Sequence, residues 1–306
     1  MSFVRKCWHV ANAVVRRGYW FNHRFLPETQ KFERYRTFDT EVVNLGTTSS
    51  LHAFNYEGLG IKAANWAMSM NPLQGDLGIL KNYSSYLKDG GATVIMSLCP
   101  FSSLAGSYDY LDDRYYRILY PTTIPHYSYT HWLRVNERWQ SPIWHYPFYA
   151  IFMDIYRIFV KKDANRSMTE EQMEADAQMR IRGWFSEFSL KDFETPLSLR
   201  NKDAIMDAAC KLDQMIDFCE EHGYKPVMIV PPMYHTLADK FTSKARTMLI
   251  DNMIDEMKHK DVRFFNYMND DAFTHSRELF ADSFDLNPNG AKVFTKRVLS
   301  DIGVLK

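Results

Sequence analysis

The chain has 306 residues, of which 46% are hydrophobic, 15% aromatic and 24% charged, and this composition fits a folded globular protein and excludes a mainly disordered one. Lysine plus arginine and aspartate plus glutamate each number 37, so the formal net charge is zero. Because nucleic-acid-binding domains usually carry a basic excess, nucleic acid is not an expected partner. A chain of this length can bury a sizeable core in one large domain or in two ordinary ones.

The first 27 residues are basic and aromatic. Their basic residues are Arg5, Lys6, Arg16, Arg17 and Arg24, and none is acidic. No apolar run is long enough for a signal peptide, so the chain is expected to be cytoplasmic. Such a segment can lie on an anionic membrane surface, which would make residues 1–27 a peripheral membrane contact. An N-terminal helical segment over residues 1–38 that packs across the domain is the simpler interpretation.

The first hundred residues alternate between strand-like and helix-like segments. Strands are expected over residues 40–45, 61–68 and 92–98, with helical segments over 51–56 and 76–88. The third strand is almost entirely apolar, which is typical of a strand buried on both faces of a parallel sheet. This alternation predicts βαβ units.

Residues 109–195 interrupt the alternation. They are rich in tyrosine and tryptophan, and the sequence TEEQ at 169–172 is a capping box that predicts a helix to about residue 188. No flexible linker flanks them, so they are expected to be a helical insertion packed on the sheet of a single domain, 1–306. The uncharged stretch 139–153 is too short to cross about 30 Å of hydrocarbon. A buried helix is its simplest interpretation, with a lipid-facing patch or a partner surface as alternatives.

Alternation resumes in the last hundred residues. A helix is expected over 202–222, stopped by Gly223, and another over 243–259 with Ser243 as its N-cap. Strands are expected over 225–230 and 262–267, and Asn287-Pro288 begins the last helix. The sequence therefore predicts a three-layer α/β/α protein, doubly wound and flavodoxin-like, with a mainly parallel five-stranded sheet.

The four cysteines form no CxxC pair and have no histidine at zinc-ligand spacing. They are expected to be reduced and mostly buried thiols, with Cys210 and Cys219 on the apolar face of one helix. The sequence thus indicates neither a disulfide framework nor a zinc site.

Ligands of open parallel sheets bind beyond the carboxyl ends of the strands. The segments that follow the expected strands are therefore the first place to look for chemistry. They are residues 46–50, 100–103, 231–235 and 280–287.

Two of these segments resemble a known family. Residues 44–54, NLGTTSSLHAF, resemble without a gap the first block of SGNH (GDSL-type) hydrolases, in the bacterial branch related to polysaccharide and teichoic-acid O-acyl transfer proteins. Residues 280–295, FADSFDLNPNGAKVFT, resemble the closing block of that branch, and residues 65–83 are similar to a stretch that brings oxyanion-hole groups. The resemblance covers most of the chain and is specific in the two terminal blocks. It implies acyl transfer to water or to a sugar hydroxyl, with an acylated carbohydrate or small ester as partner and no cofactor.

The resemblance implies a role for particular residues. The nucleophile position is Thr48, the orienting acid is Asp282, and Asp285 stands where the family has its histidine base. Further oxyanion or substrate contacts are expected from Gly46, Asn71, Ser102 and His235.

Two of the three catalytic positions depart from the family's pattern. A carboxyl group with an ordinary pKa of about 3.9 is a poor base at neutral pH compared with imidazole, and the methyl group of Thr48 crowds a tight turn. The sequence therefore predicts an acyl esterase or O-acyltransferase with weak or no activity. A non-catalytic glycan-binding or scaffold protein of a cell-surface polysaccharide pathway is the alternative.

A metal site is a weaker interpretation of the closing block. Asp285, Asn287, Asn289 and Gly290 match the first half of a calcium loop, but its twelfth position is Lys296 instead of glutamate. The asparagine at 287 is also explained as a helix cap. No metal is therefore predicted, although a cation between Asp282 and Asp285 is a minor alternative.

Overall fold

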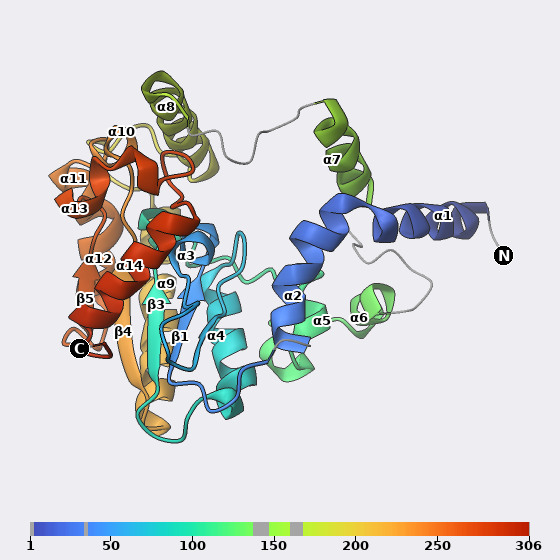
Figure 1. Ribbon diagram of the computed structural model, residues 1–306, viewed down its shortest axis with the longest axis horizontal. Helices are drawn as coiled ribbons and strands as arrows, with labels where there is room; N and C mark the ends of the chain where they lie inside the picture. Colours follow the sequence, from blue (N-terminus) through green and yellow to red (C-terminus); the bar gives the residue numbers. More distant parts are fainter. Residues whose placement is uncertain (1–2, 34–35, 137–146, 160–167, 306) are drawn as a thin grey trace. The chain divides into compact units, whose positions relative to one another are not determined.

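The structure is a computed structural model that describes residues 3–33, 36–136, 147–159 and 168–305 (Figure 1). The chain divides into two compact units. The helical unit combines Met1–Arg36 with Tyr110–Arg166, and the sheet unit combines Thr37–Asp109 with Ser167–Lys306. Residues 109–195, expected as one insertion, are thus divided between the two units.

The sheet unit is built around a five-stranded parallel sheet in the order β2-β1-β3-β4-β5. Its strands are β1 (Val42–Gly46), β2 (Ala63–Asn65), β3 (Thr93–Ser97), β4 (Lys225–Val230) and β5 (Arg263–Asn266). β1 and β3 are buried at every position, as expected of central strands in a parallel sheet. The α/β class and the five parallel strands predicted from the sequence are confirmed.

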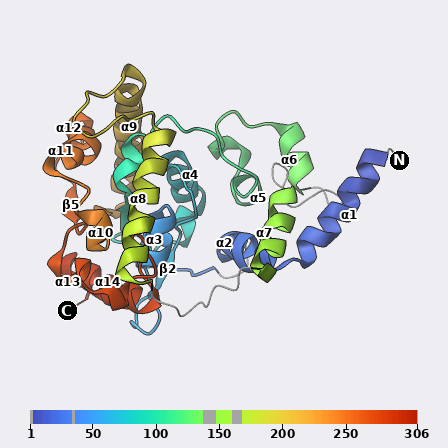
Figure 2. The ribbon, with the colours of Figure 1, turned by 90° about the horizontal axis from the view of Figure 1, so that it is seen from above.

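Helices cover both faces of this sheet (Figures 1 and 2). On one face α4 (Leu73–Tyr83) and α9 (Leu199–Glu221) pack against each other and against β1 and β4, respectively. On the other face α3 (Thr48–Ala53) packs against α14 (Pro288–Asp301) and β1. Buried apolar side chains join these two helices to the sheet, among them Val42, Ala53, Phe54, Ile95, Ile229, Phe294 and Val298.

The sheet unit also contains the long helix α8 and several helical elements of three to five residues. They are η2 (Ser84–Tyr86), η3 (Pro100–Ser103), α8 (Glu170–Glu187), α10 (His235–Ala238), α11 (Ser243–Arg246), η5 (Thr247–Asp251), α12 (Asn252–Glu256), α13 (Asp271–Thr274) and η6 (Arg277–Leu279).

The helix caps are set by local chemistry. Asn287 accepts the N–H groups of Asn289 and Gly290, and Pro288 follows it, as predicted. The capping box that begins with Thr169 is also present. The N-cap of α11, however, is Thr242 and not Ser243, because the Thr242 hydroxyl accepts the N–H of Ala245. The helix expected over 243–259 is present as one continuous helical run of α11, the π-helical turn η5 and α12, and it ends three residues earlier than expected, at Glu256.

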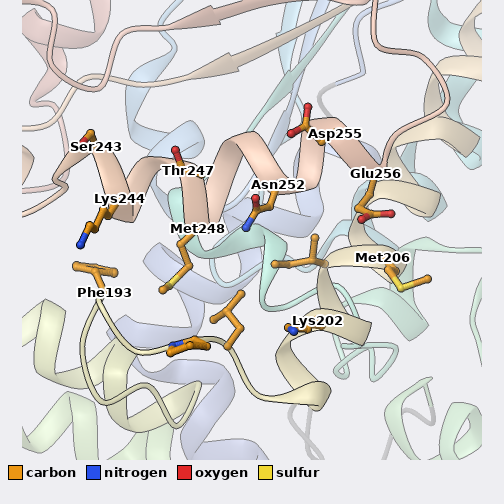
Figure 3. Close-up of a pocket in the computed structure, with 13 residues that line it drawn as sticks. Phe193, Lys202, Met206, Ser243, Lys244, Thr247, Met248, Asn252, Asp255 and Glu256 are labelled. Carbon is orange, nitrogen blue, oxygen red and sulfur yellow. The ribbon is translucent and has the colours of Figure 1, made fainter.

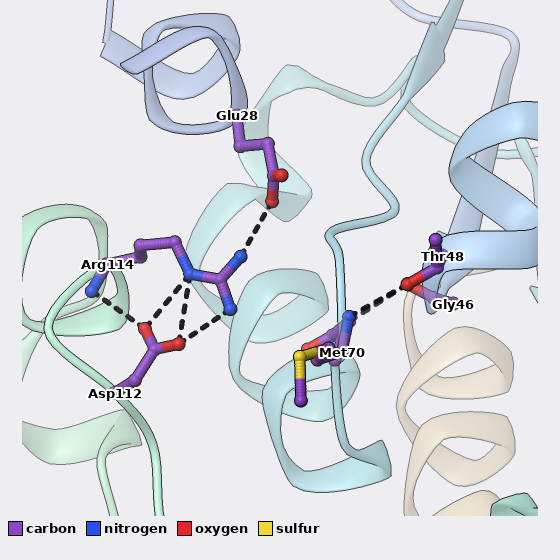
Figure 4. A network of polar contacts seen from close by, with 7 residues as sticks. Glu28, Gly46, Thr48, Met70, Asp112 and Arg114 are labelled. Carbon is purple, nitrogen blue, oxygen red and sulfur yellow. Dashed lines mark hydrogen bonds and ion pairs between the residues drawn. The ribbon is translucent and has the colours of Figure 1, made fainter. Parts of the chain in front are cut away.

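The helical unit contains α1 (Phe3–Arg17), η1 (Phe21–Phe25), α2 (Leu26–Glu33), α5 (Tyr115–Ile118), η4 (Pro121–Thr123), α6 (Tyr129–Asn136) and α7 (Pro147–Phe159). α1 packs against α7, and α2 packs against α5. Arg114, which precedes α5, pairs with Glu28 of α2 at 2.8 Å and with Asp112 at 2.6 Å (Figure 4).

The expectation of a buried helix over 139–153 is wrong for its described part. α7 exposes Phe148, Tyr149 and Phe152, whereas Ala150 is fully buried. The reason is that Ala150 packs into a cluster with Val15, Phe21 and Phe25, whereas the three aromatic residues lie outside that cluster. Residues 139–146 of that expected helix lie outside the described residues.

Two further sequence expectations have an outcome in the fold. Cys219 is buried and Cys99 partly buried, but Cys7 and Cys210 are exposed, so the expectation of mostly buried thiols is wrong. Only one side of α9 faces the core, and Cys210 is on the other. Among the described residues, the helices fall short of the length and hydropathy that spanning a bilayer requires.

Gly46 offers a test of the turn after β1. Its φ is +127°, and a Cβ atom there would lie 2.4 Å from the carbonyl oxygen of Ser97. We expect Gly46→Ala to lower the free energy of unfolding by about 3 kcal/mol or more. Gly60→Ala is the matched control, because Gly60 also has a positive φ, +70°, but has no atom within 4 Å of such a Cβ; it should cost only about 1 kcal/mol. Urea unfolding measures both, and equal losses would contradict the steric explanation.

Candidate active site at the carboxyl edge of the sheet

A buried carboxylate fixes the turn that follows β1. Asp76 of α4 accepts the N–H of Gly46 at 2.8 Å and an amide N–H of Asn71 at 2.5 Å. The same amide nitrogen donates to the carbonyl oxygen of Gly46 at 3.2 Å. Asn71, a predicted oxyanion or substrate contact, therefore uses both of its N–H groups to hold this turn.

The turn presents Thr48 at the start of α3. Its hydroxyl oxygen accepts the backbone N–H of Met70 at 3.1 Å (Figure 4), and Thr48 is half-buried. Met70 has a φ of 51°, in the left-handed region, and its side chain points to solvent with 84% exposure. Because the hydroxyl only accepts in this contact, its own proton remains available to a base or a substrate.

The acidic loop before α14 is organised by an arginine of α8. Asp282 accepts the backbone N–H groups of Phe284 and Asp285 with one carboxyl oxygen. Its other oxygen pairs with Arg180 at 2.8 Å. Arg180 also pairs with Asp176, one helical turn earlier, at 2.8 Å, so its guanidinium neutralises charge that would otherwise repel within this loop.

Asp285 is the unusual member of this group. It is only 9% exposed, and its Oδ1 has no hydrogen-bond partner among the described residues. Burial, and then the charge of Asp282, raise the pKa of the Asp285 carboxyl to about 7, against the opposing effect of Arg180. The expectation of an ordinary, weakly basic carboxylate at this position is therefore wrong: its pKa is close to that of imidazole.

The two halves of the site lie at the same edge of the sheet. Gly46 pairs with Ser97 in register, so Thr48 and Cys99 each follow two residues beyond the ends of neighbouring strands. The N–H of Tyr234, which follows β4, donates to the carbonyl oxygen of Ser283 at 3.1 Å, so the acidic loop lies at this same edge. Within the described part of the chain, however, no hydrogen bond joins Thr48 to Asp285.

Ser102 and His235 have other partners. The Ser102 hydroxyl accepts the N–H of Cys99 at 3.1 Å and so caps η3. His235 lies after β4, where its Nε2 contacts Glu170 of α8 at 2.9 Å. The neighbouring Tyr234 hydroxyl donates to the same carboxylate at 2.6 Å. These contacts describe structural roles, and the predicted roles in substrate binding stay predictions.

Sequence reasoning missed Arg180 and Asp176. The available signal was their spacing of four residues on a helix that begins with a clear capping box. Their contacts with residues 282–285 could not be read from the sequence, because these residues lie more than a hundred positions further along the chain. One such contact is the hydrogen bond that the Ser283 hydroxyl donates to Asp176 at 2.6 Å. The hydroxyls of Ser49 and Ser97 are also buried without a hydrogen-bond partner in the described residues, which gives this edge a polar lining.

Two other features of the sheet unit lie apart from these residues. A cavity of about 790 Å³ opens between α9, the 193–197 loop and the α11–α12 segment (Figure 3), and none of the candidate catalytic residues lines it. Asp217, Glu220 and His259 are close enough together to hold a metal ion. The ammonium of Lys258 already lies 3.1 Å from the Asp217 carboxylate and balances one of the two negative charges of this group.

Comparison with known proteins adds no relative: no family model, no curated protein and no solved structure matches this chain. A function therefore has to be inferred from the geometry of the sheet edge itself.

The raised pKa of Asp285 makes stability depend on pH. Because its folded pKa lies above the unfolded value, this group stabilises the fold most below about pH 4, and the contribution is lost as pH rises through about 7. We therefore expect the free energy of unfolding of Asp285→Asn to rise by about 2–3 kcal/mol relative to that of the parent between about pH 5 and pH 8. The rise should be about 1.4 kcal/mol per pH unit up to the folded pKa.

Urea unfolding at the two pH values measures this difference. Asp261→Asn is the control, since Asp261 is exposed in a loop and its substitution should leave the pH dependence of the parent unchanged. A constant difference between Asp285→Asn and the parent across this range would show that Asp285 titrates as an ordinary carboxyl.

Proposed function

We propose that this protein is an SGNH-like acyl esterase or O-acyltransferase of low activity that acts on acylated glycans. The observation that carries the proposal is that the carboxyl edge of the sheet holds both the Thr48 hydroxyl, at the first turn of α3, and the buried carboxyl of Asp285, whose Oδ1 has no hydrogen-bond partner among the described residues. The order of the five parallel strands is compatible with the resemblance of residues 44–54 and 280–295 to this family.

In this proposal Thr48 attacks the acyl carbonyl and Asp285 takes the hydroxyl proton. Attack forms a bond from the threonine oxygen to the carbonyl carbon, and collapse of the intermediate expels the sugar oxygen, to which the protonated Asp285 returns the proton. Water or another sugar hydroxyl then releases the acyl group. A base with a pKa of about 7 suits this proton transfer at neutral pH far better than an ordinary carboxylate would.

The role of Asp282 differs from that of an orienting acid. Its carboxyl oxygens are engaged by backbone N–H groups and by Arg180, so it shapes the loop and raises the pKa of Asp285. The lack of a hydrogen bond between Thr48 and Asp285, and the occupied N–H groups of Asn71, support low activity. The same two observations favour the second candidate, a non-catalytic glycan-binding protein.

Hydrolysis of p-nitrophenyl acetate and of acetylated xylan tests the proposal. We expect slow release of nitrophenol and acetate by the parent, with an apparent pKa near 7 in kcat/KM. Thr48→Ala should reduce the rate to background, because it removes the attacking oxygen. The matched control is Thr47→Ala, since the Thr47 hydroxyl caps no N–H of α3. If Thr47→Ala lost activity and Thr48→Ala did not, the nucleophile would be Thr47.

The double variant Thr48→Ser/Asp285→His restores the family's residues and should raise the rate by about 100-fold or more, since a serine with an imidazole base is the more efficient arrangement. Circular dichroism melting verifies that each variant is folded. A parent and a double variant that are both silent, although folded, would contradict the proposal. Binding of the glycan without turnover in calorimetry would favour the non-catalytic candidate.

A further inference from the structure

The helical unit carries an apolar face that its described neighbours leave uncovered. On α7 an exposed stripe recurs at helical spacing, formed by Phe148 (71% exposed), Phe152 (60%), Ile155 (49%) and Phe159 (81%). Away from this stripe, Ala150 is buried in a cluster with Val15, Phe21 and Phe25, and Asp154 accepts the N–H of Trp20 at 2.7 Å. Contiguous exposed apolar side chains of this size mark interaction surfaces on soluble proteins.

α1 has an exposed apolar stripe of its own. Its members are Phe3 (80% exposed), Cys7, Val10 (65%) and Val14 (48%), which share one side of the helix. Trp8 of α1 lies beside the first member of the α7 stripe, with the ring centroids of Trp8 and Phe148 6.2 Å apart. The two helices are in contact, and Figure 1 shows α7 rising at a steep angle from α1.

The exposed charged side chains described on α1 are positive, and the one acidic side chain of α7 is bonded within the unit. Residues 1–27 contain five basic residues and no acidic one, and Lys6, Arg16 and Arg17 are exposed. The single acidic residue of α7, Asp154, is bonded to the Trp20 backbone inside the unit. A protein with a formal net charge of zero therefore places positive charge beside these exposed apolar stripes.

Apolar stripes flanked by positive charge are the chemistry of an anionic lipid surface. Lysine and arginine gain free energy near anionic headgroups, and aromatic and aliphatic side chains gain it in the adjacent acyl region. α7 has 13 residues, about 20 Å of helix, which is shorter than the hydrocarbon core of about 30 Å. A helix of this length lies in the interface and does not cross it.

We propose that α1 and α7 together form a peripheral docking surface for bilayers that contain anionic phospholipid. The apolar stripes enter the headgroup–acyl boundary, while Lys6, Arg16 and Arg17 stay at the level of the headgroups. This surface belongs to the helical unit and does not depend on the acyl-transfer proposal.

Co-sedimentation of the full chain with vesicles tests the surface. We expect binding to vesicles of mixed phosphatidylcholine and phosphatidylglycerol, weaker binding at high salt, and little binding to phosphatidylcholine alone. Phe152→Ser/Ile155→Ser should weaken the partition at least about tenfold by removing apolar insertion. Lys6→Glu/Arg17→Glu should weaken it at least about tenfold by reversing two charges.

Matched variants in the sheet unit separate this surface from general effects. Leu199→Ser/Met206→Ser removes two exposed apolar side chains of α9, and Lys202→Glu/Lys296→Glu makes the same change in net charge; neither should alter sedimentation. All of these positions are exposed, so melting curves should stay close to the parent. Equal binding to both kinds of vesicle, or equal effects of the variants and their controls, would overturn the proposal. So would a dimer in light scattering that Phe152→Ser/Ile155→Ser dissociates while vesicles remain unbound, because a second copy would then cover the face.

Discussion

The close approach of β1 and β3 at Gly46 is the constraint on which the candidate site depends. A side chain at this position would collide with the carbonyl oxygen of Ser97, and the backbone there has a left-handed φ. The chain can therefore leave the sheet sharply and enter α3 within two residues, which puts Thr48 at the sheet edge. Asp76 holds the Gly46 N–H from the opposite helix layer, so the core on both faces of the sheet supports one short turn.

The parts of the fold that local chemistry determines could be predicted from the sequence. The apolar runs that became β1 and β3, and the caps Thr169 and Asn287, depend on neighbouring residues alone. The start of α9 was missed by three residues, since Ser198 is its cap. The burial of α7 was predicted wrongly. Apolar side chains favour burial, but whether they are buried depends on which other elements pack against that side of the helix.

The candidate site shows the same division between local and long-range causes. The expected strand ends and the resemblance of residues 44–54 and 280–295 pointed to Thr48 and the 282–285 loop. The chemistry of Asp285 could not be foreseen, because its raised pKa arises first from burial and then from the charge of Asp282, against the opposing effect of Arg180 on α8. A carboxylate that looks unsuitable as a base in the sequence thus acquires an imidazole-like pKa from its surroundings, and only the packing of distant segments reveals this.

The division into two discontinuous units has a consequence for how this chain folds during synthesis. The helical unit needs Tyr110–Arg166 to complete what Met1–Arg36 begins, and the sheet unit needs Ser167–Lys306 to supply β4 and β5. Neither unit can therefore finish folding from its first segment as it leaves the ribosome. β3 pairs with β1 on one side, but its other side must wait until β4 has emerged more than a hundred residues later, a delay during which aggregation competes with folding.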